Sequence, residues 1–443
     1  MIEKLYALFL KHPIVCTDTR DIKTGSVFFA LKGENFNGNK FAEQALNAGC
    51  SLVVIDEKEY QKDERFFLVD DVLTALQQLA NYHRKQLNIP VIGITGSNGK
   101  TTSKELINAA LSQKYKVLAT KGNLNNHIGV PLTLLSMTKE HEMAIVEMGA
   151  NHQGEIEMLC KIAEPDFGVI TNIGKAHLEG FGGIEGVKKG KSELYKFIQE
   201  QKARLPEREG KLFVHGDDPV LLELAGSCEK VTYGTEKLFD IVGLMNQNME
   251  SGFISFQWAT RYNASNLKKS ETVSTQLVGV YNYYNLLCAA CVGNYFKVDD
   301  ASINKALREY TPSNNRSQLH KTQNNVLILD YYNANPSSMS LAIENFAELN
   351  HPNKMLILGD MLELGEESAK EHMAIINLIQ QKNIKNALLV GPYFIEAGKS
   401  FGAKTFATSD DLVKFIIQHP IRENTILIKG SRGIKLEKVV DVL

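Results

Sequence analysis

The chain has 443 residues, 44% of them hydrophobic and 23% charged, and its 49 basic and 51 acidic side chains leave a net charge of −2. This length is too great for one ordinary domain, so we expect two or three. A net charge this close to zero provides no electrostatic field that would attract nucleic acid or an anionic membrane, so we expect neither as a partner.

Membrane insertion and secretion are not expected either. No run of about 18 apolar residues is present, and the first residues show no small-residue cleavage pattern. The six cysteines are scattered apart from Cys288 and Cys291, which stand in a small-residue helical run without a second pair to complete a zinc site. We therefore expect a reduced, cytoplasmic protein.

The first part of the chain, residues 1–85, mixes short apolar strands with helices. The strands are SVFFAL (26–31), SLVVID (51–56) and RFFLVD (65–70), and the helices are KFAEQALNAG (40–49) and VLTALQQLANYHRKQL (72–87). The segment LNIP follows, and a residue before proline is driven out of the helical region. We expect a domain joint there, near residue 86.

From residue 90 onward, short apolar strands alternate with amphipathic helices. PVIGITG leads into KTTSKELINAALSQ, MAIVEMGA leads into GEIEMLCKIA, and the strands FGVITNIG and KLFVHGDD follow. Such alternation predicts a parallel sheet covered on both faces. After YTPSNNRSQ (310–318) the pattern restarts, which predicts a second sheet of Rossmann-like size. The predicted domains are 1–85, 86–312 and 313–443.

The stretch VIGITGSNGKTTSKEL (91–106) resembles a phosphate loop with unusual spacing. Counting back from Gly99 puts Ile94 where the first glycine of the general motif should stand, with Gly93 one place further out. A strand, a glycine turn and a helix start direct backbone N–H groups and the positive helix end at phosphates. Lys100 would reach the β and γ phosphates and the Thr101 hydroxyl would bind Mg²⁺. We interpret the stretch as a nucleotide site.

Three further positions are candidates for a metal centre at the same sheet edge. Glu147 ends the strand AIVE, where a carboxylate could bind the same ion, although a strand-end glutamate can also belong to an ordinary turn. His177 follows another strand and could bind a second ion, although a loop histidine is more often solvated. The segment GVKKGKSELYKF offers Lys188, Lys189 and Lys191, and chemistry alone does not choose among them.

Together these segments resemble the Mur ligase family, whose members use ATP to join amino acids to cell-wall precursors. The family's loop, Thr-Gly-Ser/Thr-x-Gly-Lys-Thr, matches residues 95–101 and departs from the general spacing in the same way. The segments most similar to the branch that adds a D-alanine dipeptide are NLNNHIGVPLTLL, EMGANHQGEI, TNIGKAHLEGFG, DYYNANPSSM, LGDMLELGEES and KGSRG. The Asp-Asn-Pro-Arg signature of the branch that adds diaminopimelate or lysine is absent.

The resemblance implies a three-domain α/β fold with a small uridine-nucleotide domain, a central P-loop ATPase-like parallel sheet and a C-terminal Rossmann-like domain. It implies an ATP-dependent ligase with two Mg²⁺ ions, acting as a monomer on UDP-N-acetylmuramoyl (UDP-MurNAc) tripeptide and D-Ala-D-Ala. Another ligase of the family, adding a different amino acid, is the alternative. A non-enzymatic nucleotide switch would not need the second metal group, His177 with Lys191.

The resemblance also implies roles for individual residues. The catalytic residues would be Lys100, His177 and Lys191, with Lys191 carbamylated by CO2. The metal ligands would be Thr101, Glu147, His177 and Lys191. The ATP-binding residues would be Thr95, Gly96, Ser97, Asn98, Gly99, Lys100, Thr101, Thr102, Asn282, Arg316, Asp330 and Asn333. The substrate-binding residues would be Thr19, Arg20, Lys32, Gly33, Asn125 and Asn126.

Three ligand-positioning loops depart from the family pattern. The family usually has serine at the position of Thr19 and Asp-Gly-His where this chain has Asn37-Gly38-Asn39. It usually has asparagine at His215, and histidine at Tyr281. None of these positions belongs to the predicted metal centre.

Overall fold

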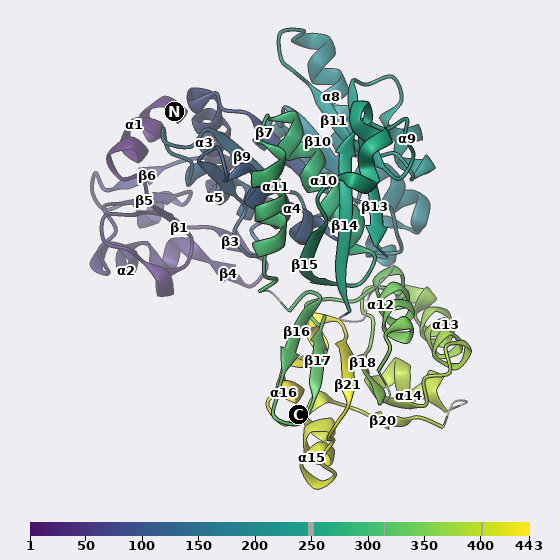
Figure 1. Ribbon diagram of the computed structural model, residues 1–443. Helices are drawn as coiled ribbons and strands as arrows, with labels where there is room; N and C mark the ends of the chain where they lie inside the picture. Colours follow the sequence, from purple (N-terminus) through teal and green to yellow (C-terminus); the bar gives the residue numbers. More distant parts are fainter. Residues whose placement is uncertain (247–251, 314, 352, 400–401) are drawn as a thin grey trace.

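Three large sheets and one separate two-stranded hairpin organise the described part of the chain, and Figure 1 shows how they are arranged. The computed structural model describes residues 1–246, 252–313, 315–351, 353–399 and 402–443. The strands of the three sheets fall within residues 15–68, 91–278 and 318–429. In Figure 1 the N-terminal part (purple) lies beside the middle part, and the C-terminal part (green to yellow) lies below it. The predicted three-domain α/β fold is confirmed, while the limits at residues 86 and 313 stay a prediction.

The N-terminal sheet is small and parallel, in the order β1-β2-β5-β6. Its central strands, β2 and β5, are buried along their whole length, as their continuous apolar sequences predict. The strands are β1 (Val15–Cys16), β2 (Val27–Phe29), β5 (Leu52–Ile55) and β6 (Phe66–Leu68), with a separate hairpin of β3 (Lys32–Gly33) and β4 (Phe36–Asn37). The helices are α1 (Ile2–Lys11), α2 (Ala42–Asn47) and α3 (Val72–Leu87).

The middle sheet has nine strands in the order β15-β14-β13-β12-β11-β10-β7-β9-β8. The strands are β7 (Val91–Thr95), β8 (Val117–Ala119), β9 (Met143–Glu147), β10 (Phe167–Ile170), β11 (Lys211–His215), β12 (Lys230–Gly234), β13 (Ile241–Asn246), β14 (Phe253–Thr260) and β15 (Val273–Val278). The helices are α4 (Lys100–Leu111), α5 (Gly129–Leu135), α6 (Glu155–Ala163), α7 (Leu178–Phe181), α8 (Ile184–Arg204), α9 (Pro219–Ala225), α10 (Asn282–Tyr295) and α11 (Asp300–Glu309).

The parallel part of this sheet is buried on both faces. Successive residues of β9 alternate between two hydrophobic clusters: Met143 and Ile145 pack with α4 and α10, while Ala144 and Val146 pack with α5, α6 and α8. The sequence predicted only the parallel strands. The structure adds an antiparallel extension, in which β14 pairs with β13 and β15.

The end of α3 ties the N-terminal part to the middle sheet. Asn88 terminates the helix in a left-handed conformation. Arg84, almost fully buried, bonds to Asp166 at 2.7 Å and to the carbonyl of Ala163 at 3.0 Å. A buried guanidinium requires such partners, so this contact fixes the helix against the start of β10.

The C-terminal sheet has the order β16-β17-β21-β18-β19-β20 and is parallel except for the edge pair β16–β17. Its strands are β16 (Gln318–Lys321), β17 (Val326–Leu329), β18 (Lys354–Gly359), β19 (Asn386–Val390), β20 (Lys404–Phe406) and β21 (Thr425–Lys429). Its helices are α12 (Pro336–Glu348), α13 (Ser368–Gln381), α14 (Pro392–Gly398), α15 (Ser409–Gln418) and α16 (Glu437–Val440). The described residues also form the 3-10 helices η1 (Thr19–Asp21), η2 (Gly38–Phe41), η3 (Lys58–Tyr60), η4 (Arg261–Lys269), η5 (Gly365–Glu367) and η6 (Arg432–Ile434).

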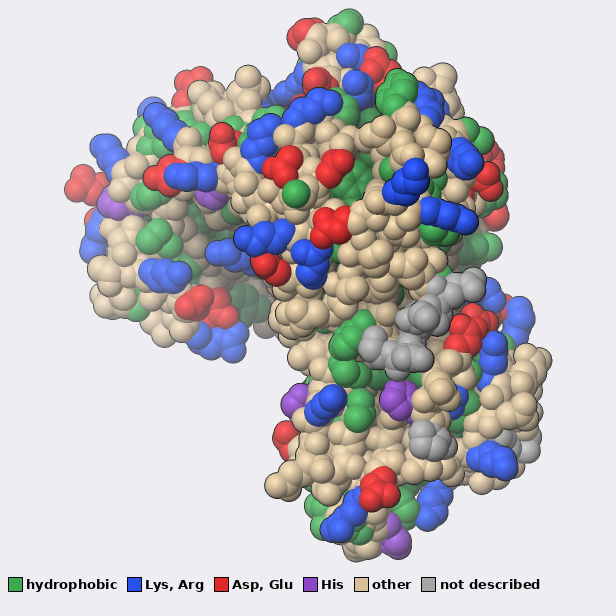
Figure 2. Space-filling view, in the orientation of Figure 1, with side chains coloured by type: hydrophobic (Ala, Val, Ile, Leu, Met, Phe, Trp, Pro, Cys, Tyr) green, Lys and Arg blue, Asp and Glu red, His purple; other side chains and the backbone are tan. Residues whose placement is uncertain are grey.

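The surface carries both signs of charge. Figure 2 shows Lys and Arg side chains interspersed with Asp and Glu over the face in view. Among the described residues, no helix combines the length and apolar character needed to cross a membrane.

Candidate active site

A cavity of about 610 Å³ lies where the middle and C-terminal parts meet. Its walls come from the segments that follow β7, β9 and β10 in the middle sheet, and β17 and β21 in the C-terminal sheet. The carboxyl ends of strands from both sheets therefore face one space, which is where parallel α/β sheets bind ligands.

The predicted phosphate loop connects β7 to α4 at this edge. Gly99 occupies the N-cap of α4 with φ +77°, and Gly96 has φ +143°. A Cβ on Gly96 would lie 2.0 Å from the Thr171 hydroxyl. Glycine is therefore required at position 96, both by the backbone conformation and by the approach of β10.

The loop is braced by the segments that follow β9 and β10. The Ser97 hydroxyl donates to the Gly174 carbonyl and accepts from the Gly174 N–H, both at 2.9 Å. The Asn98 N–H donates to Asn172 Oδ1 at 3.0 Å, and the Thr95 hydroxyl donates to the Met148 carbonyl at 2.8 Å. Residues 97–102 line the cavity, whereas Thr95 and Gly96 support the loop from below.

Lys100 lies at the start of α4 with its amine folded back on the loop. Its Nζ donates to the Gly96 carbonyl at 2.7 Å. Burial lowers the pKa of this amine to about 8; Glu147 opposes that shift and Arg316 adds to it. Phosphate oxygens would replace a carbonyl as the partner and favour the charged form.

The donor set around Thr101 and Glu147 fits a divalent cation. Both side chains are buried, and Asn125 Nδ2 donates to Glu147 Oε1 at 2.8 Å. Glu147 Oε2 is buried without a hydrogen-bond partner in the described structure. A buried carboxylate oxygen without a partner is costly, and a Mg²⁺ ion held with the Thr101 hydroxyl would satisfy it.

His177 lines the cavity at the N-cap of α7, with φ +51°. Its Nδ1 lies 2.5 Å from Oε2 of Glu363. Glu363 belongs to the segment LGDMLELGEES, but nothing in the sequence singled it out as a site residue. The pKa of Glu363 is lowered, chiefly by its contact with His177.

The structure distinguishes the three lysines of α8. Lys189 is exposed, and Lys188 pairs with Glu223 at 3.2 Å on the surface. Lys191 is only 1% exposed; its Nζ donates to the Ala150 carbonyl at 3.1 Å and lies 4.9 Å from the centre of the Phe181 ring. Burial lowers the pKa of Lys191 well below its usual value. Such an amine is readily neutral, as reaction with CO2 requires.

The C-terminal part contributes the predicted nucleotide residues. Asp330 Oδ2 pairs with Lys429 at 2.6 Å, and Asp330 Oδ1 accepts from the Ser317 N–H at 3.2 Å. The Arg316 guanidinium lies 3.9 Å from the centre of the Tyr332 ring, and its Nε is buried without a partner in the described structure. An unsatisfied guanidinium N–H directed at a cavity suits an anionic ligand.

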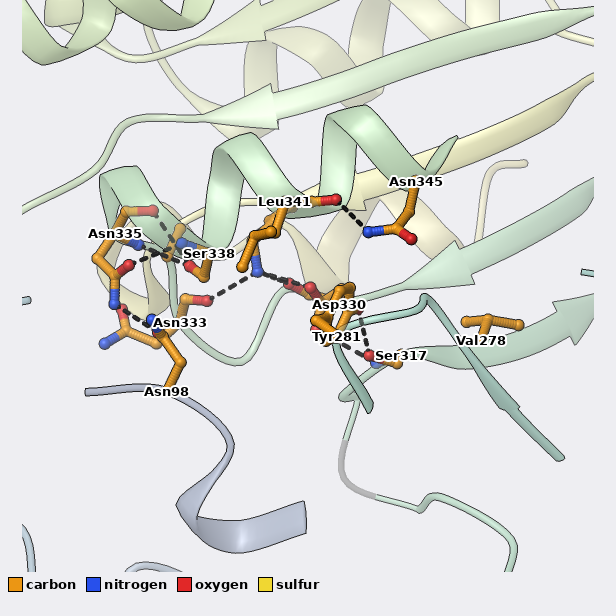
Figure 3. Close-up of polar contacts among 12 residues, drawn as sticks. Asn98, Val278, Tyr281, Ser317, Asp330, Asn333, Asn335, Ser338, Leu341 and Asn345 are labelled. Atoms are coloured by element: carbon orange, nitrogen blue, oxygen red, sulfur yellow. Dashed lines mark hydrogen bonds and ion pairs between the residues drawn. The ribbon is translucent and has the colours of Figure 1, made fainter. Parts of the chain in front are cut away.

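Figure 3 shows how the two parts meet beside Asp330 and Asn333. Asn335 Nδ2 donates to Asn98 Oδ1 at 2.7 Å, which links the start of α12 to the phosphate loop. Asn282, Arg316, Asp330 and Asn333 all line the cavity. Tyr281, where the family usually has histidine, bonds to the Ser317 hydroxyl at 2.6 Å.

The predicted substrate residues fall into two groups. Asn125 and Asn126 line the cavity, and Asn126 Oδ1 also accepts from the N–H of Gly129, the first residue of α5, at 2.8 Å. Outside the cavity, in the N-terminal part, Arg20 pairs with Asp18, and Lys32 pairs with Asp56 and Glu57 at 3.0 and 3.5 Å. Thr19 and Gly33 flank these cations and also lie outside the cavity.

Several cavity residues have no counterpart in the sequence-based selection. Among them are Asn172, Tyr281, Asn285, Tyr332, Asn335, Glu363, Lys429 and Arg432. Four of these, Tyr332, Asn335, Lys429 and Arg432, lie in the segments DYYNANPSSM and KGSRG, which carry the family resemblance. Nothing in the sequence distinguishes them as site residues from the residues next to them in the chain. Their contacts come from elements that are distant in the chain.

Comparison with known proteins matches three family models in chain order. Residues 13–93 match the Mur ligase family catalytic domain, residues 94–293 the Mur ligase middle domain, and residues 315–432 the Mur ligase glutamate ligase domain. The UDP-N-acetylmuramoyl-tripeptide–D-alanyl-D-alanine ligase of Bacillus subtilis (strain 168) is 37% identical over 437 residues, 96% of this chain and 92% of the relative.

The chain belongs to the Mur ligase family.

Solved structures agree with this assignment. The Mur ligase described here is similar to a MurF crystal structure from Acinetobacter baumannii, with a TM-score of 0.84, 32% identity, and coverage of 97% of this chain and 92% of that one. It is also similar to the MurF ligase from Thermotoga maritima in complex with ADP, with a TM-score of 0.83, 26% identity, and coverage of 98% and 97%. The family resemblance inferred from the motifs is confirmed.

Proposed function

We propose that this Mur ligase joins D-alanyl-D-alanine to UDP-MurNAc-tripeptide at the expense of ATP, in cytoplasmic cell-wall precursor synthesis. The observation that carries the proposal is one cavity that holds a phosphate loop, an unsatisfied Glu147 carboxylate and His177, in a chain 37% identical to a ligase of that name. The ADP complex of the similar Thermotoga maritima ligase supports ATP as the nucleotide.

The first step activates the terminal carboxylate of the tripeptide. A carboxylate oxygen attacks the γ-phosphorus of ATP, the bond from that phosphorus to the bridging oxygen breaks, and ADP leaves. Lys100 and the N–H groups at the start of α4 stabilise the charge that builds on the transferred phosphoryl group. Two Mg²⁺ ions, when bound, would neutralise further charge on the phosphates.

The second step forms the amide. The amino group of D-Ala-D-Ala attacks the carbonyl carbon of the acyl phosphate and loses a proton, and the carbon–oxygen bond to phosphate breaks. Acyl phosphates react readily with water, so the C-terminal part must cover the cavity while the intermediate exists. The bond between Asn335 and Asn98 brings that part onto the phosphate loop.

The metal ligands are part of the same proposal. Thr101 and Glu147 would hold one ion, and His177 would hold the second together with a carbamate on Lys191. Carbamylation would convert a buried amine that has no carboxylate partner in the described structure into an anion. We also propose that Arg316, Asp330 and Asn333 position the nucleotide, and that Thr19, Arg20, Lys32 and Gly33 bind the uridine end of the substrate.

Product formation tests the proposal. Purified protein supplied with ATP, Mg²⁺, UDP-MurNAc-tripeptide and D-Ala-D-Ala should release ADP and form the UDP-linked pentapeptide, identified by its mass. Reactions without dipeptide, or with single amino acids instead, are the controls. Faster ADP release with a single amino acid would favour another Mur-type ligase. Slow ATP hydrolysis that ignores every acceptor would favour a nucleotide switch.

A further inference from the structure

The loop that carries His177 is held by the C-terminal part at alternate residues. The N–H of Lys175 donates to the Ser337 hydroxyl at 2.9 Å, and its Nζ pairs with Glu371 at 2.5 Å. His177 meets Glu363, and the N–H of Glu179 donates to the Glu363 carbonyl at 3.5 Å. The conformation of this loop therefore depends on contacts from a different domain.

The contact between His177 and Glu363 joins two backbones in an uncommon conformation. His177 has φ +51° and Glu363 has φ +62°, and neither is glycine or asparagine. Each such residue costs free energy that the surrounding structure must supply. Both side chains line the cavity. Two strained residues that face each other across a domain joint indicate a functional arrangement.

The segment that presents Glu363 is rigidly held. The Met361 N–H donates to Nε2 of the buried His372 at 3.0 Å, and the Leu362 N–H donates to the Ser431 hydroxyl at 3.0 Å. Two residues further on, Gly365 packs against the side chain of Glu179. Glu363 is thus held in place by the C-terminal core.

Because Nδ1 of His177 contacts Glu363, Nε2 is the ring nitrogen that remains available to a ligand. Nδ1 is buried and makes no hydrogen bond of regular geometry in the described structure, but it lies 2.5 Å from Oε2 of Glu363, within ion-pair distance. Metal-binding histidines commonly donate their other ring N–H to a carboxylate, which fixes the tautomer and the ring orientation. We propose that Glu363 is a positioning residue for His177, so that Nε2 is presented to a divalent cation only when the C-terminal domain is docked.

This inference deepens the proposed function and rests on its two-metal centre. Docking of the C-terminal domain would then control the affinity for the second cation, because that cation would bind tightly only after the domain supplies Glu363. Binding of that cation would in return favour the docked arrangement, since coupling between two equilibria is reciprocal.

Metal counting tests the inference without any acceptor substrate. The probe is Mn²⁺, titrated into the full chain with β,γ-imido-ATP, and free Mn²⁺ is followed by electron paramagnetic resonance. We expect two bound ions in the unchanged chain. Glu363→Ala should weaken the second by about 10- to 100-fold and leave the first unchanged. Glu363→Gln, whose amide oxygen still accepts a hydrogen bond, should be affected less.

Controls distinguish a positioning role of Glu363 from an effect on protein folding and from the proposed ligase activity. Glu366→Gln alters an exposed glutamate of the same segment and should match the unchanged chain, and thermal unfolding should show that each variant is folded. Equal or tighter binding of the second ion in Glu363→Ala, or only one ion in the unchanged chain, would overturn the inference. If the protein ligates a different acceptor, it would form no product with D-Ala-D-Ala. The unchanged chain and Glu363→Ala would still differ in their affinity for the second ion.

Discussion

At the scale of single residues, burial shifts the pKa values of two lysines in the proposed site and leaves a carboxylate oxygen without a hydrogen-bond partner in the described structure. Lys191 is a buried amine and Lys100 a half-buried one, both with lowered pKa values, and one carboxylate oxygen of Glu147 has no hydrogen-bond partner among the described residues. An unpaired buried charge costs free energy, and a ligand of opposite charge relieves that cost. The site is therefore prepared for phosphate at one position and for cations at another.

The lowered pKa of Lys100 predicts how nucleotide affinity depends on pH. With a pKa of about 8, instead of the ordinary 10.5, the amine of the ligand-free protein loses its proton as pH rises above 8. Phosphate binding requires the charged form, so affinity for β,γ-imido-ATP should fall above that pH, approaching about tenfold per pH unit. Titration calorimetry from pH 7 to 9.5, in buffers of different ionisation enthalpy, would measure the fall and the proton uptake. Lys100→Arg, which stays charged, should abolish both effects, and pH-independent binding by the unchanged chain would contradict this account.

Replacement of Lys191 tests the proposed carbamate. Lys191→Ala should reduce ADP formation to background, because one ligand of the second metal is lost, and acetate or formate should restore part of the rate by occupying the same space. Lys189→Ala, on the exposed side of α8, is the matched control and should retain full activity. A fully active Lys191→Ala variant would exclude this role.

At the scale of the element, the phosphate loop works because neighbouring strands leave room only for glycine. Gly96 lies against Thr171 at the end of β10, so the loop and the adjacent strand are packed as one unit. The general motif for such loops would put its first glycine at position 94, where this chain has isoleucine. The packing against β10 explains why Gly96, and not Gly93, is the glycine that the loop needs.

Gly96→Ala should therefore damage both stability and nucleotide binding. Its backbone conformation alone costs on the order of 1–3 kcal/mol for a non-glycine residue, and displacement of Thr171 adds to that. Gly25→Ala is the matched control, because Gly25 also has a positive φ (+85°) but has open space at its Cβ position. It should lower the unfolding temperature by the backbone cost alone, less than Gly96→Ala does, and leave nucleotide affinity unchanged. Thermal unfolding and calorimetry would compare the two, and normal binding by Gly96→Ala would contradict the packing argument.

At the scale of the whole molecule, two domain joints serve different purposes. The N-terminal joint is closed by buried contacts such as the pair between Arg84 and Asp166. The C-terminal joint borders the cavity and is held by polar contacts, among them Lys175 with Glu371 and Asn335 with Asn98. Polar, partly exposed contacts are weak and reversible, which suits a joint that must open for substrates.

Weakening the C-terminal joint should open the molecule. Lys175→Ala removes the pair with Glu371 and should destabilise docking by about 1 kcal/mol, since the lysine is half exposed and screened by solvent. Small-angle scattering should then report a larger radius of gyration, with the exposed Lys139→Ala as control. The exchanged pair Lys175→Glu with Glu371→Lys should restore the compact form. An unchanged radius in Lys175→Ala would show that other contacts suffice to hold the joint.

The sequence by itself determined the features that depend on local order along the chain. Strand and helix alternation predicted the parallel sheets, and the loop with Lys100 and Thr101 predicted the nucleotide site at the edge where Glu147 ends its strand. The tertiary structure decided what depends on distant partners. It buried Lys191 and left Lys189 exposed, added the antiparallel strands β14 and β15, and brought Glu363 to His177 and Lys429 to Asp330. The physical reason is that burial and long-range contacts arise only when the domains pack, and neither is encoded in any single stretch of the chain.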